Sequence, residues 1–249
     1  MDPSLLEFAY DAVFDRIPNL TWRPWVGERW RCDKPVPRVL IVGESHYSRR
    51  DAGISIEETV ARHKGNRDFT REIIWECPVS QEWKNPTLNR IAPLLLGDGA
   101  YDRASFWRDV AFFNLVQRPL KHLSSEDAEE GEPAERPTAA DYELGWSIFP
   151  EIVEAIDPDV CLFLGTSSRP YLGQSMQERG IMHGSEKSEK IGRCWGYSGM
   201  LTLKKKGLRL LFVQHPGRYF STPMWHEFVL RECPDLATFQ THQSLLASG

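Results

Sequence analysis

Four residues that could do chemistry together each stand at the end of a short apolar run: Glu44, Asn114, Ser167 and His215. A carboxylate can stabilise developing positive charge and orient water, and an imidazole can donate to a developing anion. The amide of Asn114 offers both a donor and an acceptor. These side chains form one site only if the runs that precede them lie side by side.

The apolar runs are rich in β-branched and aromatic residues and predict buried parallel strands. We place the strands near residues 38–43, 109–116, 159–165 and 209–214. Parallel strands bring their carboxyl ends to one edge of a sheet, which is where open α/β sheets bind ligands. Helical or long segments separate the runs, so we expect a single α/β domain with the four residues on one rim.

Each residue alone also fits a purely structural role. Glu44 could cap a helix or pair with an arginine, and Asn114 could be a buried hydrogen-bonding residue. The stretch 165–168 could be a simple helix cap, and His215-Pro216 could be a turn. The ordered set is therefore more informative than any of its members.

The other elements follow from periodicity and from cap residues. The clearest amphipathic helix covers 138–156, where Tyr142, Trp146 and Phe149 share one face. Residues 194–203 and 208–214 predict a hairpin. Residues 18–37 predict an irregular wrap, and the last dozen residues are weakly specified. Further helices are expected over 3–17, 54–64, 69–75, 90–96, 168–180 and 224–230.

The composition is that of a globular protein of 249 residues with a net charge of -5. Six of the acids lie in residues 126–135, and without them the net charge is +1. We expect 124–137 to be a solvated acidic surface loop and the remaining body to carry a basic face. The sequence has five scattered cysteines without a CxxC pair, which gives a metal site little support. With no long apolar run and no secretory signal, we expect a cytoplasmic monomer that does not enter the membrane.

The ordered motifs resemble those of the uracil-DNA glycosylase superfamily over about residues 36–230. They are Gly-Glu-x-x-Tyr at 43–47, Pro-Thr-Leu-Asn at 86–89, Phe-Asn at 113–114, Leu-Gly-x-Ser at 164–167 and His-Pro-Gly at 215–217. The resemblance implies a three-layer α/β/α sandwich around a four-stranded parallel sheet. It also implies excision of a uracil-like or modified base from DNA by hydrolysis of the N-glycosidic bond, without a metal or redox cofactor.

The resemblance assigns roles residue by residue. Glu44 and His215 would be catalytic, and Asn114 would recognise the flipped base. Tyr47 would form the wall near C5 of the base, and Trp75 would stack on the base, with Phe69 as the second choice. Gly43, Ser45 and His46 complete the expected base-binding set.

The remaining motif residues are expected to contact DNA. The resemblance places the backbone-contacting loops at Asn85, Pro86 and Thr87, and at Gly165, Thr166, Ser167, Ser168 and Arg169. Pro216, Gly217, Arg218 and Tyr219 are also expected to contact DNA. The bulky residues after the His-Pro turn, Arg218, Tyr219 and Phe220, would fill the gap left by the flipped nucleotide. Arg49 and Arg50 would add to the same basic face.

A second hypothesis is a catalytically silent protein on the same fold that binds DNA or a partner. The presence of both Glu44 and His215 favours an enzyme, since a binding protein needs neither. A nucleotide-binding α/β protein has less support, because the sequence contains no GxGxxG and no GxxxxGK[ST].

Overall fold

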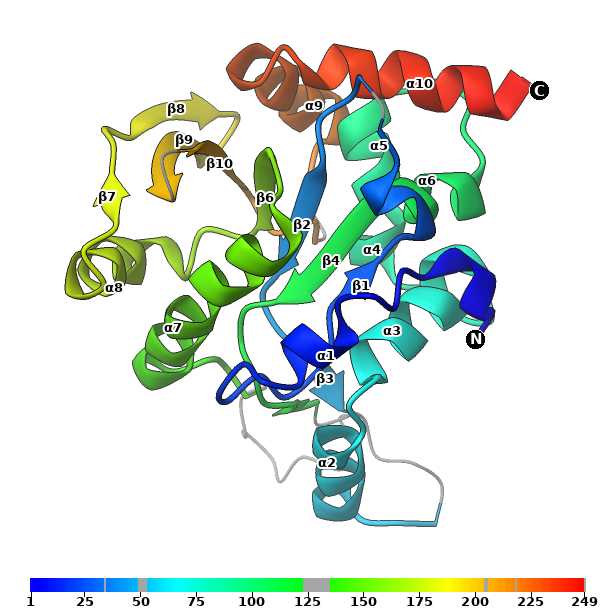
Figure 1. The fold of residues 1–249 in the computed structure, drawn as a ribbon, viewed down its shortest axis with the longest axis vertical. Coiled ribbons are helices and arrows are strands. Elements are labelled where there is room, and N and C mark those ends of the chain that lie inside the picture. The colour runs from blue at the N-terminus through cyan, green and yellow to red at the C-terminus, as the bar shows by residue number, and fades with distance from the viewer. Residues whose placement is uncertain (34, 49–52, 123–134, 204–205, 218, 249) are drawn as a thin grey trace.

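The fold is mixed α/β, with a large β-sheet at the centre of the molecule and helices around it (Figure 1). The computed structural model describes residues 1–33, 35–48, 53–122, 135–203, 206–217 and 219–248. Within these residues the sheet has eight strands in the order β1-β4-β2-β6-β10-β9-β7, and β8 also pairs with β9. Its strands are β1 (Trp25–Val26), β2 (Val39–Gly43), β4 (Val110–Asn114), β6 (Val160–Leu164), β7 (Met182–His183), β8 (Lys187–Ile191), β9 (Cys194–Leu203) and β10 (Lys206–Val213).

The four strands predicted from the apolar runs are confirmed as parallel neighbours. They are β4, β2, β6 and β10, and each starts and ends within a few residues of its expected position. The sheet is wider than four strands because antiparallel neighbours cover both of its outer parallel strands. β1 pairs with β4, and β9 pairs with β10 as the predicted hairpin. Such pairing satisfies backbone groups that an exposed edge would leave open.

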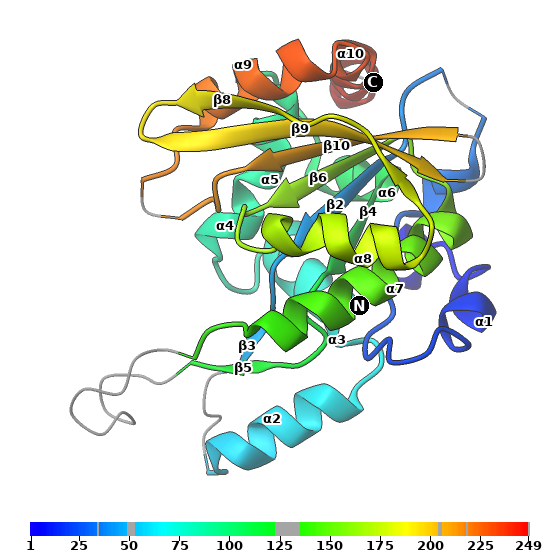
Figure 2. The ribbon, with the colours of Figure 1, turned by 90° about the vertical axis from the view of Figure 1, so that its left-hand side faces the viewer.

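Both faces of the sheet are buried against helices. Successive strand side chains point to opposite faces. Thus Ile41 and Leu162 belong to one apolar cluster, whereas Leu40 and Phe163 belong to the other. Helices α5, α6, α9 and α10 supply the first cluster, and α7 and α8 supply the second (Figure 2). This double burial explains why the strand sequences are continuously apolar.

The helices have the following bounds. The α-helices are α1 (Asp11–Phe14), α2 (Ile56–Gly65), α3 (Phe69–Ile74), α4 (Pro86–Asn89), α5 (Ile91–Leu96), α6 (Arg103–Asp109), α7 (Ala139–Ile156), α8 (Leu172–Glu178), α9 (Thr222–Glu232) and α10 (Leu236–Ser248). Short 3-10 turns cover Pro3–Leu5, Glu28–Arg31 and Arg169–Tyr171, and one π-helical turn covers Trp75–Val79. None of the helices within the described ranges has the length and apolar character needed to cross a membrane.

One helix prediction is wrong, and one weakly specified segment forms a helix. Residues 3–17 do not form one helix, because the backbone of Leu6 and Glu7 pairs with Val26 and Gly27 and leaves only short turns. The last dozen residues do form a helix, α10, whose buried Leu236 and Phe239 pack under α6 and α5. In both cases tertiary contacts outweigh the local sequence signal.

A second, small sheet lies beside the carboxyl ends of the parallel strands. It consists of β3 (Tyr47–Ser48) and β5 (Leu120–Lys121), which pair in parallel. Figure 2 shows this sheet near the edge toward which β2 and β6 point. Most of the expected acidic loop falls outside the described residues; its last acid, Glu135, forms an ion pair with Arg118.

Gly145 provides a test of how α7 packs on the sheet. A Cβ at this position would lie 2.4 Å from the Leu115 carbonyl oxygen, so we expect Gly145→Ala to destabilise the protein by about 1–3 kcal/mol. Gly173 in α8 is the matched control because a Cβ there would meet nothing within 4 Å. Gly173→Ala should be neutral or stabilising by up to about 1 kcal/mol. Urea denaturation of both variants measures this; equal stability changes would contradict the close packing.

Candidate functional site

Two adjoining pockets occupy the rim where the parallel strands end. The larger one, here called the Asn114 pocket, has a volume of about 820 Å³ and extends to α3 and to residues 83–88. The smaller one, the Trp195 pocket, has a volume of about 660 Å³ and extends to the start of β9. Four residues line both: Glu44, Tyr47, His122 and His215. The structure therefore brings the two expected catalytic residues to the junction of the pockets.

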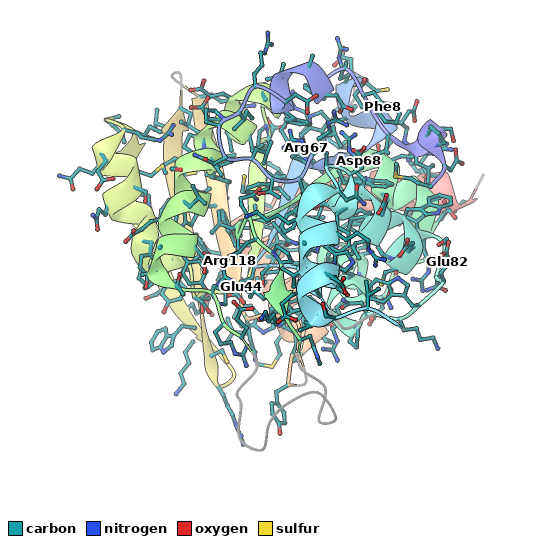
Figure 3. All side chains as sticks on the ribbon, turned by 90° about the horizontal axis from the view of Figure 1, so that it is seen from below. Phe8, Glu44, Arg67, Asp68, Glu82 and Arg118 are labelled. Carbon is teal, nitrogen blue, oxygen red and sulfur yellow. The ribbon has the colours of Figure 1, made fainter. Side chains whose placement is uncertain are left out.

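Glu44 follows β2 and is held by a tyrosine from α7. The Tyr142 hydroxyl donates to Glu44 Oε1 at 2.7 Å. Burial, followed by the nearby Glu44 carboxylate, raises the pKa of Tyr142 well above its usual value, so this phenol stays a donor. Glu44 Oε2 has no hydrogen-bond partner within the described chain. Figure 3 shows Glu44 between α7, in green, and α2, in cyan. One carboxylate oxygen is thus fixed while the other is available to a ligand.

His215 follows β10 in a tightly held loop. The Gly217 amide donates to the His215 carbonyl at 2.6 Å. The Arg90 guanidinium donates to the Pro216 carbonyl at 2.8 Å and also to that of Gly217, and Thr87 donates to Pro216 at 3.5 Å. These bonds join the loop at 85–87 to the His-Pro-Gly loop. They fix the backbone from which His215 reaches the pocket junction.

The His215 residue is solvent-exposed at the pocket mouth, yet enough protein surrounds its ring to affect its charge. Desolvation lowers the pKa of His215 below its ordinary value of 6.5, and the positive charge of Arg136 lowers it further. The Glu44 carboxylate acts in the opposite direction and raises it. The imidazole is therefore mostly neutral at pH 7, and a neutral ring can still donate one N–H.

Asn114 is the last residue of β4 and is 4% exposed. Its backbone carbonyl accepts from the Gln117 side chain, whereas its side-chain amide has no hydrogen-bond partner among the described residues. The amide oxygen rests against Gly43, where a Cβ would come within 2.1 Å of it. Gly43 is therefore needed for close approach. An unpaired buried amide that lines a pocket is a group that a ligand can satisfy.

The two residues between Glu44 and Tyr47 have different environments. His46 is buried, and its Nε2 lies 2.8 Å from Thr70 Oγ1. Burial lowers the pKa of His46 to about 3, with a smaller contribution from His63. The ring of His46 also packs edge-on against Trp22 and Phe69. Ser45 Oγ is buried without a hydrogen-bond partner in the described chain. Both residues line the Asn114 pocket.

The aromatic wall of the Asn114 pocket differs from the first expectation. Trp75 does not line either pocket. It starts the π-helical turn after α3, is half-buried, and packs against the apolar cluster that contains Ile41 and Leu162. Phe69, the second choice, does line the Asn114 pocket, as does Phe112 of β4. Phe69 stacks on the His63 ring at 4.1 Å. The helix periodicity of 69–75 could not show which aromatic residue faces the rim.

The Gly165–Ser168 loop lies on the Trp195 pocket side. Gly165 has φ +139°, a conformation that favours glycine, and Gly165, Thr166 and Ser167 line the pocket. Ser168 is buried, and its carbonyl accepts from the Trp146 indole at 2.8 Å. The Arg169 guanidinium pairs with Glu186 at 2.6 Å and lies 3.9 Å from the Tyr197 ring centre. Arg169 is thus held within the protein.

The other expected DNA-contacting residues are spread along the rim. The Asn85 side chain caps α4 by accepting from the Thr87 amide at 2.9 Å. Asn85, Pro86 and Thr87 line the Asn114 pocket. Pro216 is buried, and Tyr219 is 80% exposed. Three expected residues, Arg49, Arg50 and Arg218, lie outside the described residues.

Sequence reasoning missed several residues of the site. Tyr142 shares the apolar face of α7 with Trp146, so its pattern indicated only core packing; its hydroxyl was the available signal for a polar contact. Arg90 directly follows the motif at 86–89, but the motif did not show its contact with the His-Pro-Gly loop, and His122 and Trp195 belong to no motif; only the fold brings these residues to the rim. Within the described ranges no group of three or more His, Cys, Asp and Glu side chains is arranged to hold a metal ion.

Opposite charges beside His215 generate a pair of predictions of opposite sign. Glu44→Gln removes the carboxylate that raises the pKa of His215, so that pKa should fall further below 6.5. Arg136→Gln removes a cation that lowers it, so the pKa should rise. Titration of the His215 ring by NMR, assigned with His215→Ala, measures both. Shifts in the same direction would contradict this arrangement of charges.

His46 predicts acid destabilisation of the fold. Its folded pKa of about 3 lies below the ordinary value of 6.5, so the unfolded chain binds more protons between these values. Stability from this group is complete above pH 6.5 and is lost as the pH falls, by about 1.4 kcal/mol per pH unit. His46→Gln should be less stable at pH 7.5 but should lose this part of the slope. Urea denaturation between pH 7.5 and 5 measures it, and equal slopes would contradict the assignment.

No protein-family model matches the sequence, and no curated protein matches it. The resemblance to the uracil-DNA glycosylase superfamily therefore rests on the motifs themselves. Their residues meet at one rim: Glu44 and His215 at the pocket junction, Asn114 in one pocket and Ser167 in the other.

Proposed function

We propose that this protein is a DNA glycosylase that acts as a monomer on a flipped base held in the Asn114 pocket. The observation that carries this proposal is that Glu44, His215 and the unpaired amide of Asn114 line the same pocket. A base inside a duplex is unreachable, so the target must rotate out of the stack into such a pocket. The proposal includes a three-layer α/β/α arrangement around the parallel strands, with the pockets at their carboxyl ends.

Glu44 would act on the sugar side of the scissile bond. As the N-glycosidic bond breaks, its electron pair leaves with the base and the sugar gains positive character. The free oxygen of Glu44 can balance that charge and orient the water whose oxygen bonds to C1′. The hydrogen bond from Tyr142 to the other oxygen limits rotation of the carboxylate. Tyr142 is thus a positioning residue that acts through Glu44.

His215 would act on the base side. The departing base carries the electron pair and develops negative charge on an oxygen next to the broken bond. A neutral imidazole can donate its N–H to that oxygen, and the lowered pKa of His215 favours this neutral form at pH 7. The bonds from Arg90 and Thr87 to the following loop hold the ring close to its working position. The proton from the attacking water restores the neutral base after cleavage.

Asn114 would choose the base. Its amide presents one donor and one acceptor group to the edge of a base, while Phe69 and Phe112 offer apolar ring surface. The volume of about 820 Å³ lies in the range of pockets that hold drug-sized ligands, so it has room for a substituted base as well as for uracil. Both substrate classes therefore belong in a test.

The glycosylase proposal is tested with oligonucleotides that carry uracil or a panel of modified bases. Released base is identified by mass analysis, and the abasic product is revealed by alkali cleavage. We expect Glu44→Gln and His215→Ala each to slow release by about 10²–10³, because each removes a charge-stabilising group. Asn114→Ala should also reduce base discrimination. Tyr142→Phe should cost less, about 10-fold, since it removes one hydrogen bond to a charged group.

The matched control is Glu143→Gln, which neutralises an exposed carboxylate next to Tyr142 that lines neither pocket. It should retain the parental rate. Parental rates for both Glu44→Gln and His215→Ala on a verified substrate would refute the mechanism. Failure to release any base from a broad panel, with DNA binding retained, would favour a catalytically silent DNA-binding protein.

A further inference from the structure

The Trp195 pocket contains a wall that the proposed chemistry does not use. Trp195 is 50% exposed although it is a large apolar side chain. It lies near the start of β9, before Tyr197, whose partner Phe212 is the last residue of β10 in that pairing. Trp195 therefore lies beyond the last residue pair between β9 and β10. Together with Gln214 and His215 it lines the pocket. An exposed tryptophan beside a candidate catalytic junction points to a ligand surface.

Cationic side chains lie beside the rings of this wall. Lys190 of β8 pairs directly with Trp195 of β9, so the two side chains share one face of the hairpin. Two residues further along the same face is Tyr197, covered by the Arg169 guanidinium at 3.9 Å. Arg136, which lies shortly before helix α7, also lines this pocket. Neither Lys190 nor Arg136 forms an ion pair with any described residue. Aromatic rings in a groove with positive charges are the pattern that binds single-stranded nucleic acid.

The position of the pocket identifies which nucleotide it would receive. The two pockets share the wall formed by Glu44, Tyr47, His122 and His215. A strand whose target base enters the Asn114 pocket therefore places an adjacent nucleotide at the Trp195 pocket. The volume of about 660 Å³ accommodates a nucleobase with its sugar. In a duplex the nucleotide beside the flipped base stays paired and stacked on its other neighbour, so only an unpaired nucleotide can turn into a separate pocket and place a ring face on Trp195.

We propose that the Trp195 pocket is a second nucleobase site, in which Trp195 stacks on the base adjacent to the excised one in an unpaired DNA strand. Lys190 and Arg136 neutralise the phosphates that flank this base. The adjacent position rests on the proposed glycosylase function, whereas binding of a single strand through Trp195 does not. The site makes the protein prefer single-stranded over duplex DNA.

Binding of an unmodified, fluorescently labelled single strand tests the site without requiring catalysis. Anisotropy titration of Trp195→Ala should show a loss of affinity of roughly 5- to 150-fold, since one stacked base is lost. Trp195→Phe should retain most of the affinity because it keeps an aromatic face. Lys190→Gln should weaken binding and reduce its salt dependence. The matched control is Phe8→Ala, an aromatic residue that is 44% exposed, lies outside both pockets and is labelled in Figure 3; it should bind like the parent.

A double-mutant cycle locates the stacked base. The target base is kept, and an abasic spacer replaces the nucleotide on one side of it or on the other. The affinity of each strand is measured for the parent protein and for Trp195→Ala. If Trp195 stacks on that nucleotide, the two losses are not additive, and the spacer costs little once Trp195 is gone. Additive losses on both sides, or unchanged binding by Trp195→Ala, would overturn the proposal.

The outcomes separate this inference from the glycosylase proposal. If no base is ever released but single strands bind through Trp195, the nucleobase site stands and the catalytic proposal falls. If Glu44-dependent release is intact while Trp195→Ala binds and cleaves normally, the second site falls and the glycosylase stands. Tighter binding of duplex than of single-stranded DNA, or no DNA binding at all, would also overturn the second site.

Discussion

The site depends on one constraint, the register of the four parallel strands. Val39 pairs with both Val110 and Val160, and Val160 also pairs with Arg209, so the strands start side by side. From these paired residues the strands run on for the same length, so they also end side by side, with Gly43 opposite Asn114 and Leu164 opposite Val213. A shift of one residue would turn every side chain of a strand to the other face. Continuous burial on both faces thus fixes the place where Glu44 and His215 emerge.

Helix α7 converts this alignment into a defined geometry at the rim. It begins at a capping box in which the side chains of Thr138 and Asp141 accept from each other's backbone amides. The Asp141 carboxylate also accepts a hydrogen bond from the Arg118 guanidinium. Gly145 allows the helix to touch the Leu115 backbone. From that position Tyr142 reaches Glu44, and Trp146 reaches the Ser168 carbonyl. One helix therefore covers a face of the sheet and orients two of the four rim loops.

The sequence was most informative where burial and local pattern agree. The apolar runs predicted the parallel strands, and the 3.6-residue period predicted α7, because both signals arise from the core that those residues form. The same logic failed for residues 3–17, whose apolar spacing is helical but whose backbone pairs with Val26 and Gly27. Trp75 and Phe69 lie on one short helical stretch, and only the packing of α3 decides that Phe69 reaches the pocket. Trp195 lies in no motif, and its place at the rim depends on the register of β9 against β10, which the sequence does not show.

The arrangement of charge at the junction suits the charge separation that the proposed cleavage of an N-glycosidic bond would create. Positive character develops on the sugar and negative charge on the base, so a carboxylate and a neutral donor are needed on opposite sides of one bond. Glu44 receives a hydrogen bond from Tyr142, and desolvation together with Arg136 keeps His215 mostly neutral against the effect of Glu44. A protonated Glu44 would leave the charge on the sugar unbalanced, and a second carboxylate in place of His215 would oppose the departing base. Recognition can then differ in the two flanking pockets while the junction stays the same. Under the proposed function, Asn114 and Trp195 would select the DNA, and Glu44 and His215 at the strand ends would carry out the reaction.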